Sequence, residues 1–262
     1  MEYRNGNLIS STERGPSASG SSGIFNLNSH LVYKNVGKWP GSFVTNGLIL
    51  KLDAGDPASY SGSGATWTDL SSSGNDATMP LQNGPTYSSA NSGYFTFDGT
   101  DDYAATSGSQ TLSSATFVGW IYRNGSQSSS GLIYGRAGGL NSNGVTFLGT
   151  TNNLGYTWHS EPNTYTYNSG LTPPDQQWCM FAVAISSSSA DFYLYQSSGL
   201  TTASNSVSHG STTVGNLNVG RDDYSGGRHF NGRIAAAYVY NRALTSSELQ
   251  LNFDANKGRY GL

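Results

Sequence analysis

Charged side chains are scarce in this sequence: aspartate, glutamate, lysine and arginine make up 11% of its 262 residues, whereas about 25% is usual for a globular protein. Only 13 residues are lysine or arginine, and the formal net charge is −3. Binding to nucleic acid depends on a basic surface that displaces counterions from phosphates, so the composition argues against a nucleic-acid partner. Global disorder is excluded as well, because disordered chains contain few aromatic residues and this one has 17 tyrosines, 10 phenylalanines and 5 tryptophans.

Cysteine is almost absent, since Cys179 is the only one in the sequence, and this excludes a framework of intrachain disulfides. Its neighbours Trp178, Met180 and Phe181 are apolar, so we expect a buried, inert thiol. Long hydrophobic runs are missing too, because nothing approaches the about 18 apolar residues of a membrane span. The opening residues lack the apolar core of a signal peptide. We therefore expect neither membrane insertion nor classical secretion.

The first part of the chain differs in composition from the rest. Residues 1–23 show no apolar periodicity and end in a stretch rich in glycine and serine, which is typical of a linker. The segment that follows carries apolar side chains that water would leave unfavourably exposed. These are Phe25, Leu27, Tyr33 and Trp39. We predict that residues 1–40 form an arm that docks, through these four anchors, on the main domain of residues 41–262 or on a partner chain. The alternative is a strand that completes a sheet.

From Gly47 onward, short runs that alternate apolar and polar residues are separated by glycine, asparagine, aspartate and serine. Examples are residues 48–52, 94–97, 115–122, 178–185 and 233–240. Regular short strands of this kind are typical of a sandwich or barrel. No intervening run is long enough for a crossover helix, so the sheets must be antiparallel. The sequence therefore predicts an all-β fold.

One short helix is predicted near the C-terminal end. Thr245 and Glu248 have the spacing of a capping box, and Leu244 and Leu249 have that of a hydrophobic staple. The helix should stop before Gly258, and we expect it to serve packing rather than chemistry.

Several ordered segments resemble the laminin G-like branch of the concanavalin A-like lectin/glucanase superfamily, especially the versions found in tailed-phage virion proteins. These segments are residues 48–60, 66–71, 74–78, 83–87, 97–103, 230–234, 238–244, 252–253 and 258–261, and the resemblance covers about residues 47–262. It implies an antiparallel jelly-roll β-sandwich of two sheets whose first and last strands pair, with the short C-terminal helix and the N-terminal arm added.

The same resemblance implies a non-catalytic phage virion-surface protein, in a tail fibre, tail tip or capsid decoration. Such a protein would be made in the host cytoplasm, would be held to other virion proteins by its arm and would recognise host-surface polysaccharide. We expect a homo-oligomer, although no coiled-coil heptads are present to enforce one. One alternative is a purely structural cement protein without a ligand. Another is a bacterial glycan-binding or glycoside hydrolase domain.

Enzymatic activity is not expected from the acidic residues. Glycoside hydrolases need two carboxyl groups about 5 Å apart when retaining and about 6.5–9.5 Å apart when inverting. Glutamate occurs only at positions 2, 13, 161 and 248, without the Glu-x-Asp-x-Glu pattern of the glucanases that share this fold. Neighbouring aspartates point to opposite faces of an extended strand, although aspartates from different loops could still meet. Zinc-ligand spacings and phosphate-binding loops are also missing.

A calcium site is a further implication of the resemblance, since relatives often hold Ca²⁺ at the sandwich rim. Calcium takes six to eight oxygen ligands, which loops can supply. The candidate ligands are Asp98, Asp101, Asp102, Asp222 and Asp223. The alternative is that these aspartates form Asx-turns beside glycine. Residues 235–237 are alanines where many relatives carry acids, which weakens the calcium prediction.

A saccharide site is predicted from an aromatic and polar stretch. Sugar rings stack on exposed aromatic faces while a few polar groups fix their orientation. Residues 156–168 have this composition, and the candidate ligands are Tyr156, Trp158, His159, Tyr165, Tyr167 and Asn168. Alternating aromatic residues also pack across strands, so a structural role is the alternative. Trp67, Trp120 and Trp178 are expected in the core.

Overall fold

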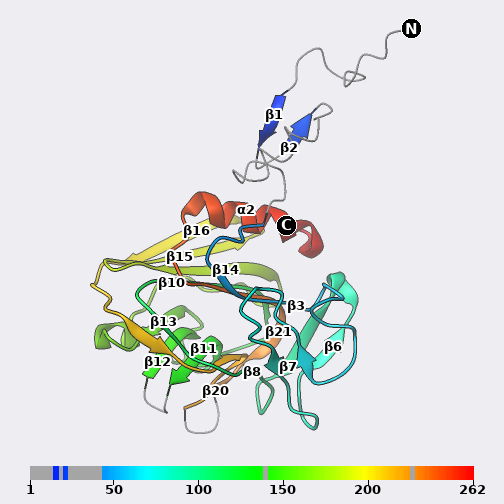
Figure 1. Ribbon diagram of the computed structural model, residues 1–262, viewed down its shortest axis with the longest axis horizontal. Coiled ribbons are helices and arrows are strands. Elements are labelled where there is room, and N and C mark those ends of the chain that lie inside the picture. The colour runs from blue at the N-terminus through cyan, green and yellow to red at the C-terminus, as the bar shows by residue number, and fades with distance from the viewer. Residues whose placement is uncertain (1–13, 18–19, 23–42, 138–140, 225–227) are drawn as a thin grey trace. The chain divides into compact units, whose positions relative to one another are not determined.

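The computed structural model of the protein describes residues 14–17, 20–22, 43–137, 141–224 and 228–262. Its strands form two large antiparallel sheets and three two-stranded ribbons (Figure 1). Two compact units are distinguished: residues 47–244, which contain both large sheets, and residues 1–46 together with 245–262. The four predicted anchors Phe25, Leu27, Tyr33 and Trp39 lie outside the described residues.

The larger sheet has eight strands in the order β16-β15-β14-β10-β21-β7-β6, with β3 also paired to β21. Their bounds are β3 (Leu48–Asp53), β6 (Thr86–Ser88), β7 (Tyr94–Asp98), β10 (Ala115–Arg123), β14 (Trp178–Ile185), β15 (Ala190–Gln196), β16 (Gly199–Asn205) and β21 (Asn231–Tyr240). Strand β3 opens the unit of residues 47–244 and pairs with β21, its last strand, with Leu50 opposite Val239. The predicted pairing of first and last strands is therefore confirmed.

The smaller sheet has seven strands in the order β13-β12-β11-β18-β8-β5-β4. Their bounds are β4 (Thr66–Trp67), β5 (Ala77–Thr78), β8 (Ala104–Thr106), β11 (Gly131–Ala137), β12 (Asn141–Phe147), β13 (Leu154–Trp158) and β18 (Leu217–Val219). The ribbons pair β1 (Arg14–Ser17) with β2 (Gly20–Ser22), β9 (Gln110–Leu112) with β17 (Thr212–Val214), and β19 (Arg221–Asp222) with β20 (Arg228–His229). Short 3₁₀ turns are η1 (Ala90–Ser92) and η2 (Pro162–Thr166).

One hydrophobic core joins the two large sheets. Phe117 and Phe181 enter it from the eight-stranded sheet, and Ile133, Phe147 and Tyr156 enter from the seven-stranded sheet. Because side chains alternate along a strand, Val118 and Trp120 of β10 lie on the opposite face of the eight-stranded sheet from Phe117. The predicted all-β, antiparallel sandwich is confirmed.

Two predictions about buried groups are also confirmed. Trp67, Trp120 and Trp178 are buried, and of these three Trp67 belongs to the core between the two large sheets. Cys179 is completely buried, and this burial raises the pKa of its thiol. Since the thiolate is the reactive form, the structure describes an inert cysteine.

The unit formed by residues 1–46 and 245–262 contains the predicted helix, α2 (Ser246–Asn256), followed by η3 (Lys257–Tyr260). The Thr245 hydroxyl accepts a hydrogen bond from the backbone N–H of Glu248, and the Glu248 carboxylate accepts one from the backbone N–H of Thr245. The capping box is thus confirmed. No helix in the described parts of the chain combines the length and apolar character needed to cross a membrane.

Candidate functional site

A polar and aromatic hollow lies on the solvent-facing side of strands β11, β12 and β13. It has a volume of about 450 Å³. Its lining residues are Tyr134, Arg136, Ser142, Thr157, Tyr165, Tyr224 and Arg228. All of them belong to the unit of residues 47–244, and we call this feature the Arg–Tyr hollow.

Strand register builds the floor of the Arg–Tyr hollow. Tyr134 on β11 lies opposite Gly144 on β12, which in turn lies opposite Thr157 on β13. Gly144 adopts a φ of +137°, and a Cβ there would lie 2.2 Å from the carbonyl oxygen of Ile133. Only glycine fits this backbone, so the row has a gap between its two side chains, and the floor stays open.

The β19–β20 ribbon forms one wall because it packs along β11. A Cβ on Gly131, the first residue of β11, would lie 2.2 Å from the carbonyl carbon of Arg221. This close approach brings Asp222 under the hollow and Tyr224 and Arg228 to its border.

A buried carboxylate links two arginines of the hollow. The Arg136 Nε and Nη2 groups donate to Asp222 Oδ1 at 3.0 and 2.8 Å, and Arg228 Nη1 donates to Asp222 Oδ2 at 2.7 Å. The Asp222 side chain is only 1% exposed, whereas that of Arg228 is 38% exposed. Arg136 Nη1 also donates to Ser142 Oγ. The network carries one negative and two positive charges.

Two exposed tyrosine rings border the hollow. Tyr224 is 53% exposed, and its ring centre lies 4.9 Å from the Arg136 guanidinium carbon and 4.7 Å from that of Arg228. Tyr165 is 41% exposed, and its hydroxyl lies 3.2 Å from His159 Nδ1. Partial burial raises the pKa of Tyr165, so its hydroxyl is a neutral donor and acceptor near neutral pH.

The η2 turn positions Tyr165. Glu161 caps it, with its carboxylate accepting a hydrogen bond from the backbone N–H of Asn163 at 3.0 Å, and Pro162 supplies a favourable first residue. The Thr164 hydroxyl accepts from the backbone N–H of Trp158 at 2.8 Å, which ties the turn to the end of β13. Tyr165 therefore departs from the strand alternation that precedes it.

The structure separates the residues that were predicted to bind saccharide. Tyr156 and Trp158 are 1% and 0% exposed and belong to the core. The Tyr156 hydroxyl lies 2.8 Å from His209 Nε2, and Trp158 Nε1 donates to the carbonyl of Gly210. Neither ring has a face that a surface ligand can reach, so Tyr156 and Trp158 are not part of the candidate saccharide site.

The other four predicted residues are accessible. Tyr165 lines the Arg–Tyr hollow and His159 contacts it. Tyr167 is half-buried, packs against Phe192 and donates its hydroxyl to the carbonyl of Ser204. Asn168 is exposed, and its side-chain oxygen accepts hydrogen bonds from a neighbouring asparagine and a backbone N–H. Tyr167 and Asn168 thus lie outside the Arg–Tyr hollow, and their predicted binding roles stay predictions.

A second cluster is acidic. Side-chain oxygens of Asp98, Asp101 and Asp102 all lie within 4.8 Å of one another. Burial raises the pKa of Asp102 to about 6, and the like charges of Asp98 and Asp101 add to the shift, while a hydrogen bond from the Asp98 backbone opposes it. Three carboxylates this close together form a group that could hold a hard metal ion, although calcium would need at least three further oxygens.

Asp222 and Asp223 are not part of this acidic group in the described structure. Both oxygens of Asp222 are ion-paired with arginines, and Asp223 lies 3.4 Å from Arg221 Nη2. The Asx-turn alternative holds for Asp98, because its carboxylate accepts hydrogen bonds from the backbone N–H groups of Thr100 and Asp101.

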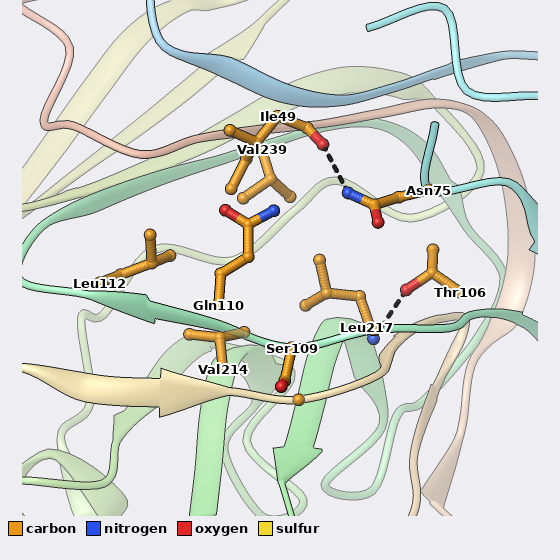
Figure 2. A pocket seen from close by; sticks show the side chains of 11 residues that line it. Ile49, Asn75, Thr106, Ser109, Gln110, Leu112, Val214, Leu217 and Val239 are labelled. Carbon is orange, nitrogen blue, oxygen red and sulfur yellow. Dashed lines mark hydrogen bonds between the residues drawn. The ribbon is translucent and has the colours of Figure 1, made fainter. Parts of the chain in front are cut away.

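A smaller, apolar cavity of about 110 Å³ lies elsewhere in the same unit, beside the β9–β17 ribbon. Ile49, Leu112, Val214 and Val239 line it, and Figure 2 shows the Gln110 side chain pointing toward Ile49 and Val239. Its volume is smaller than the about 150 Å³ cavity that accommodates benzene. The cavity is thus unsuited to a sugar ring.

The fold and the Arg–Tyr hollow define a class, namely an antiparallel β-sandwich of the lectin type with an open polar and aromatic surface site. A model of the concanavalin A-like lectin/glucanases superfamily matches residues 98–250. The chain belongs to this superfamily. No curated protein matches its sequence.

Solved structures show the same fold at low sequence identity. Trypanosoma rangeli sialidase in complex with the inhibitor DANA aligns with a TM-score of 0.56 and 16% identity over 82% of this chain and 34% of the sialidase. The same enzyme as a covalent intermediate with 2,3-difluorosialic acid aligns with a TM-score of 0.58 and 15% identity over 85% of this chain and 34% of the sialidase. The HCR/D W1238A mutant aligns with a TM-score of 0.55 and 11% identity over 82% of this chain and 52% of the mutant protein. The chain therefore spans about a third to a half of the length of these structures.

Proposed function

We propose that the protein binds saccharides in the Arg–Tyr hollow without transforming them. The main support is the pair of exposed rings of Tyr165 and Tyr224, which border a floor of hydroxyl and guanidinium groups. They are two of the most exposed aromatic rings described. Such rings offer faces for sugar stacking, and the floor offers both hydrogen-bond donors and acceptors. Membership of a lectin superfamily supports the proposal, although the fold alone does not define a ligand.

Catalysis is not part of the proposal, because the hollow lacks a carboxylate pair among the residues described. Its nearest acid, Asp222, is ion-paired twice, and Glu161 caps the η2 turn. The Asp98, Asp101 and Asp102 carboxylates are close enough for glycoside hydrolysis in principle, but they line neither the Arg–Tyr hollow nor the apolar cavity beside the β9–β17 ribbon. A hydrolase therefore remains the alternative, and release of reducing ends from bound polysaccharide would establish it.

The biological setting we propose is the surface of a tailed-phage virion. In this setting, residues 1–40 attach the protein to other virion proteins, a homo-oligomer displays several hollows, and the ligand is host-surface polysaccharide. Synthesis would occur in the host cytoplasm. Deleting residues 1–40 should abolish incorporation into particles, and retained incorporation would rule the arm out as the anchor. A cement protein without a ligand is the rival, and it predicts incorporation without any saccharide binding.

A glycan array probed with the full chain tests the binding proposal. Wild-type protein should bind a defined set of saccharides, and the variant Tyr165→Ala/Tyr224→Ala should lose this binding by at least about tenfold, since each stacking ring contributes roughly 1 kcal/mol. Leu81→Ala is the matched control, because Leu81 is 88% exposed and lies outside the hollow. Binding unchanged in the tyrosine variant would contradict the assignment to this hollow.

A second candidate function is calcium binding by Asp98, Asp101 and Asp102, which we propose because oxygens of their three carboxylates all lie within 4.8 Å of one another. Bound Ca²⁺ would be held by these side chains and would supply charge neutralisation at the rim. Adding Ca²⁺ to chelator-treated protein should raise its Tm, and Asp101→Asn should weaken this effect. An unchanged Tm at millimolar Ca²⁺ would remove the metal from the proposal.

A further inference from the structure

Resting on the proposed saccharide binding, we propose that the Arg–Tyr hollow selects saccharides that carry a carboxylate. Arg228 would bind the carboxylate directly, and Arg136 and Asp222 would act as positioning residues that hold Arg228 in place.

The first argument is the charge balance of the hollow. One arginine is sufficient to neutralise a buried aspartate, and Arg136 already does so with two N–H groups on Asp222 Oδ1. Arg228 adds a second positive charge on Oδ2. The nearby Asp223 does not compensate this surplus, because its side chain is 53% exposed and paired with Arg221. The hollow thus has an excess of one positive charge.

The second argument is the number of unused donors. All three guanidinium nitrogens of Arg136 donate to Asp222 or Ser142. Arg228 uses only Nη1, so within the described part of the chain its Nε and Nη2 groups have no acceptor. These two groups form one edge of the guanidinium, the fork that matches both oxygens of a carboxylate.

The third argument is orientation. The Arg228 guanidinium carbon lies 4.7 Å from the ring centre of Tyr224, while its Nη1 is fixed by Asp222 at 2.7 Å. A guanidinium held by both a ring and an ion pair loses little further freedom when it binds a ligand. Because Arg228 also lines the hollow next to an exposed tyrosine, a ring stacked there can place its carboxylate at the unused edge.

Matched pairs of saccharides provide the test. The probes are oligosaccharides of galacturonic, glucuronic, mannuronic and sialic acid, each compared with its carboxyl-reduced neutral form, by calorimetry or biolayer interferometry on the full chain. At least one acidic probe should bind about 10- to 100-fold more tightly than its reduced form, as expected for one bidentate charge-assisted contact. Arg228→Gln should abolish this difference. Arg221→Gln, which removes the same charge at an arginine paired with Asp223, should retain it.

The outcomes separate this proposal from the one on which it rests. If acidic and reduced forms bind equally and both depend on Tyr165 and Tyr224, saccharide binding stands and carboxylate selection is wrong. If Arg221→Gln removes the preference as fully as Arg228→Gln, general surface charge accounts for it and the assignment to Arg228 is wrong. If a sulfated neutral oligosaccharide binds as tightly as the acidic probes, the selection is for any anion and the carboxylate claim fails. If no saccharide binds at all, both proposals fail.

Discussion

Replacement of Asp222 by asparagine tests the buried ion network most directly. The substitution Asp222→Asn keeps the shape of the side chain and one acceptor oxygen, but it deprives two arginines of their shared counter-charge. The Asp222 side chain is 1% exposed and that of Arg136 is 11% exposed, so water cannot easily replace the lost interaction. Breaking a buried pair by removing one partner costs about 3–5 kcal/mol. Since Arg228 is 38% exposed and can rehydrate, we expect the lower value, about 3 kcal/mol.

The assay is thermal and urea unfolding followed by circular dichroism. For a protein of this size, about 3 kcal/mol corresponds to a fall in Tm of roughly 6–12 °C. Asp223→Asn is the control, because it makes the same change in net charge at a side chain that is 53% exposed and 3.4 Å from its arginine. An exposed pair of this kind contributes at most about 1 kcal/mol. If the two variants unfold within about 1 kcal/mol of each other, the reasoning about burial is refuted.

Three further predictions concern groups outside this network. Burial lowers the pKa of His209 below 6.5, so the unfolded chain takes up the proton first and the contribution of His209 to stability falls as pH drops below about 6.5. Because the raised pKa of Asp102 acts in the opposite direction over the same range, the measurement is the free energy of unfolding of the wild type minus that of His209→Gln, which should decrease from about pH 7.5 to 5.5. The pKa of Asp102 is raised to about 6, so the contribution of its protonated form to stability is lost as pH rises through about 6. In the presence of a chelator, Asp102→Asn should therefore raise the Tm at about pH 7.5 but not at about pH 4. An equal gain in Tm at the two pH values would contradict the prediction. Gly144→Ala should lower the free energy of unfolding of the protein by at least about 2 kcal/mol, because its Cβ would strain the backbone and overlap with the carbonyl of Ile133. Urea unfolding measures this loss, and an unchanged free energy of unfolding would show that β12 can shift to make room.

The fold could be predicted because its signals are local. The capping box of Thr245 and Glu248 needs only three residues of separation, and the period-two alternation of β13 needs five. The same alternation also explains why two residues of the predicted saccharide site, Tyr156 and Trp158, are buried in the core. Tyr156 and Trp158 share parity with Leu154, so an apolar face at positions i, i+2 and i+4 places all three in the core. Tyr165 escapes this rule because η2 follows the strand.

Most of the Arg–Tyr hollow could not be predicted, since its residues are brought together by strand pairing over long distances. Arg136 and Asp222 are 86 residues apart, and they meet only because β19 packs along β11. Nothing local distinguishes Asp222 from Asp98 as a metal ligand. Asp98 and Asp102 meet within one turn, and Arg228 lies six residues from Asp222 across the β19–β20 ribbon, so both pairs are close in sequence, whereas Arg136 and Asp222 are not.

The network of Arg136, Asp222 and Arg228 is costly for a chain in which only 11% of residues are charged. Removing a carboxylate from water costs several kcal/mol, and well-packed apolar side chains of similar volume often stabilise a fold equally well or better. The sandwich has a continuous apolar core that includes Phe147 and Phe192, and none of these three charged residues belongs to it. A second arginine whose Nε and Nη2 groups have no acceptor among the described residues, next to an exposed tyrosine in an open hollow, matches the proposed acidic saccharide, which would bring the missing negative charge.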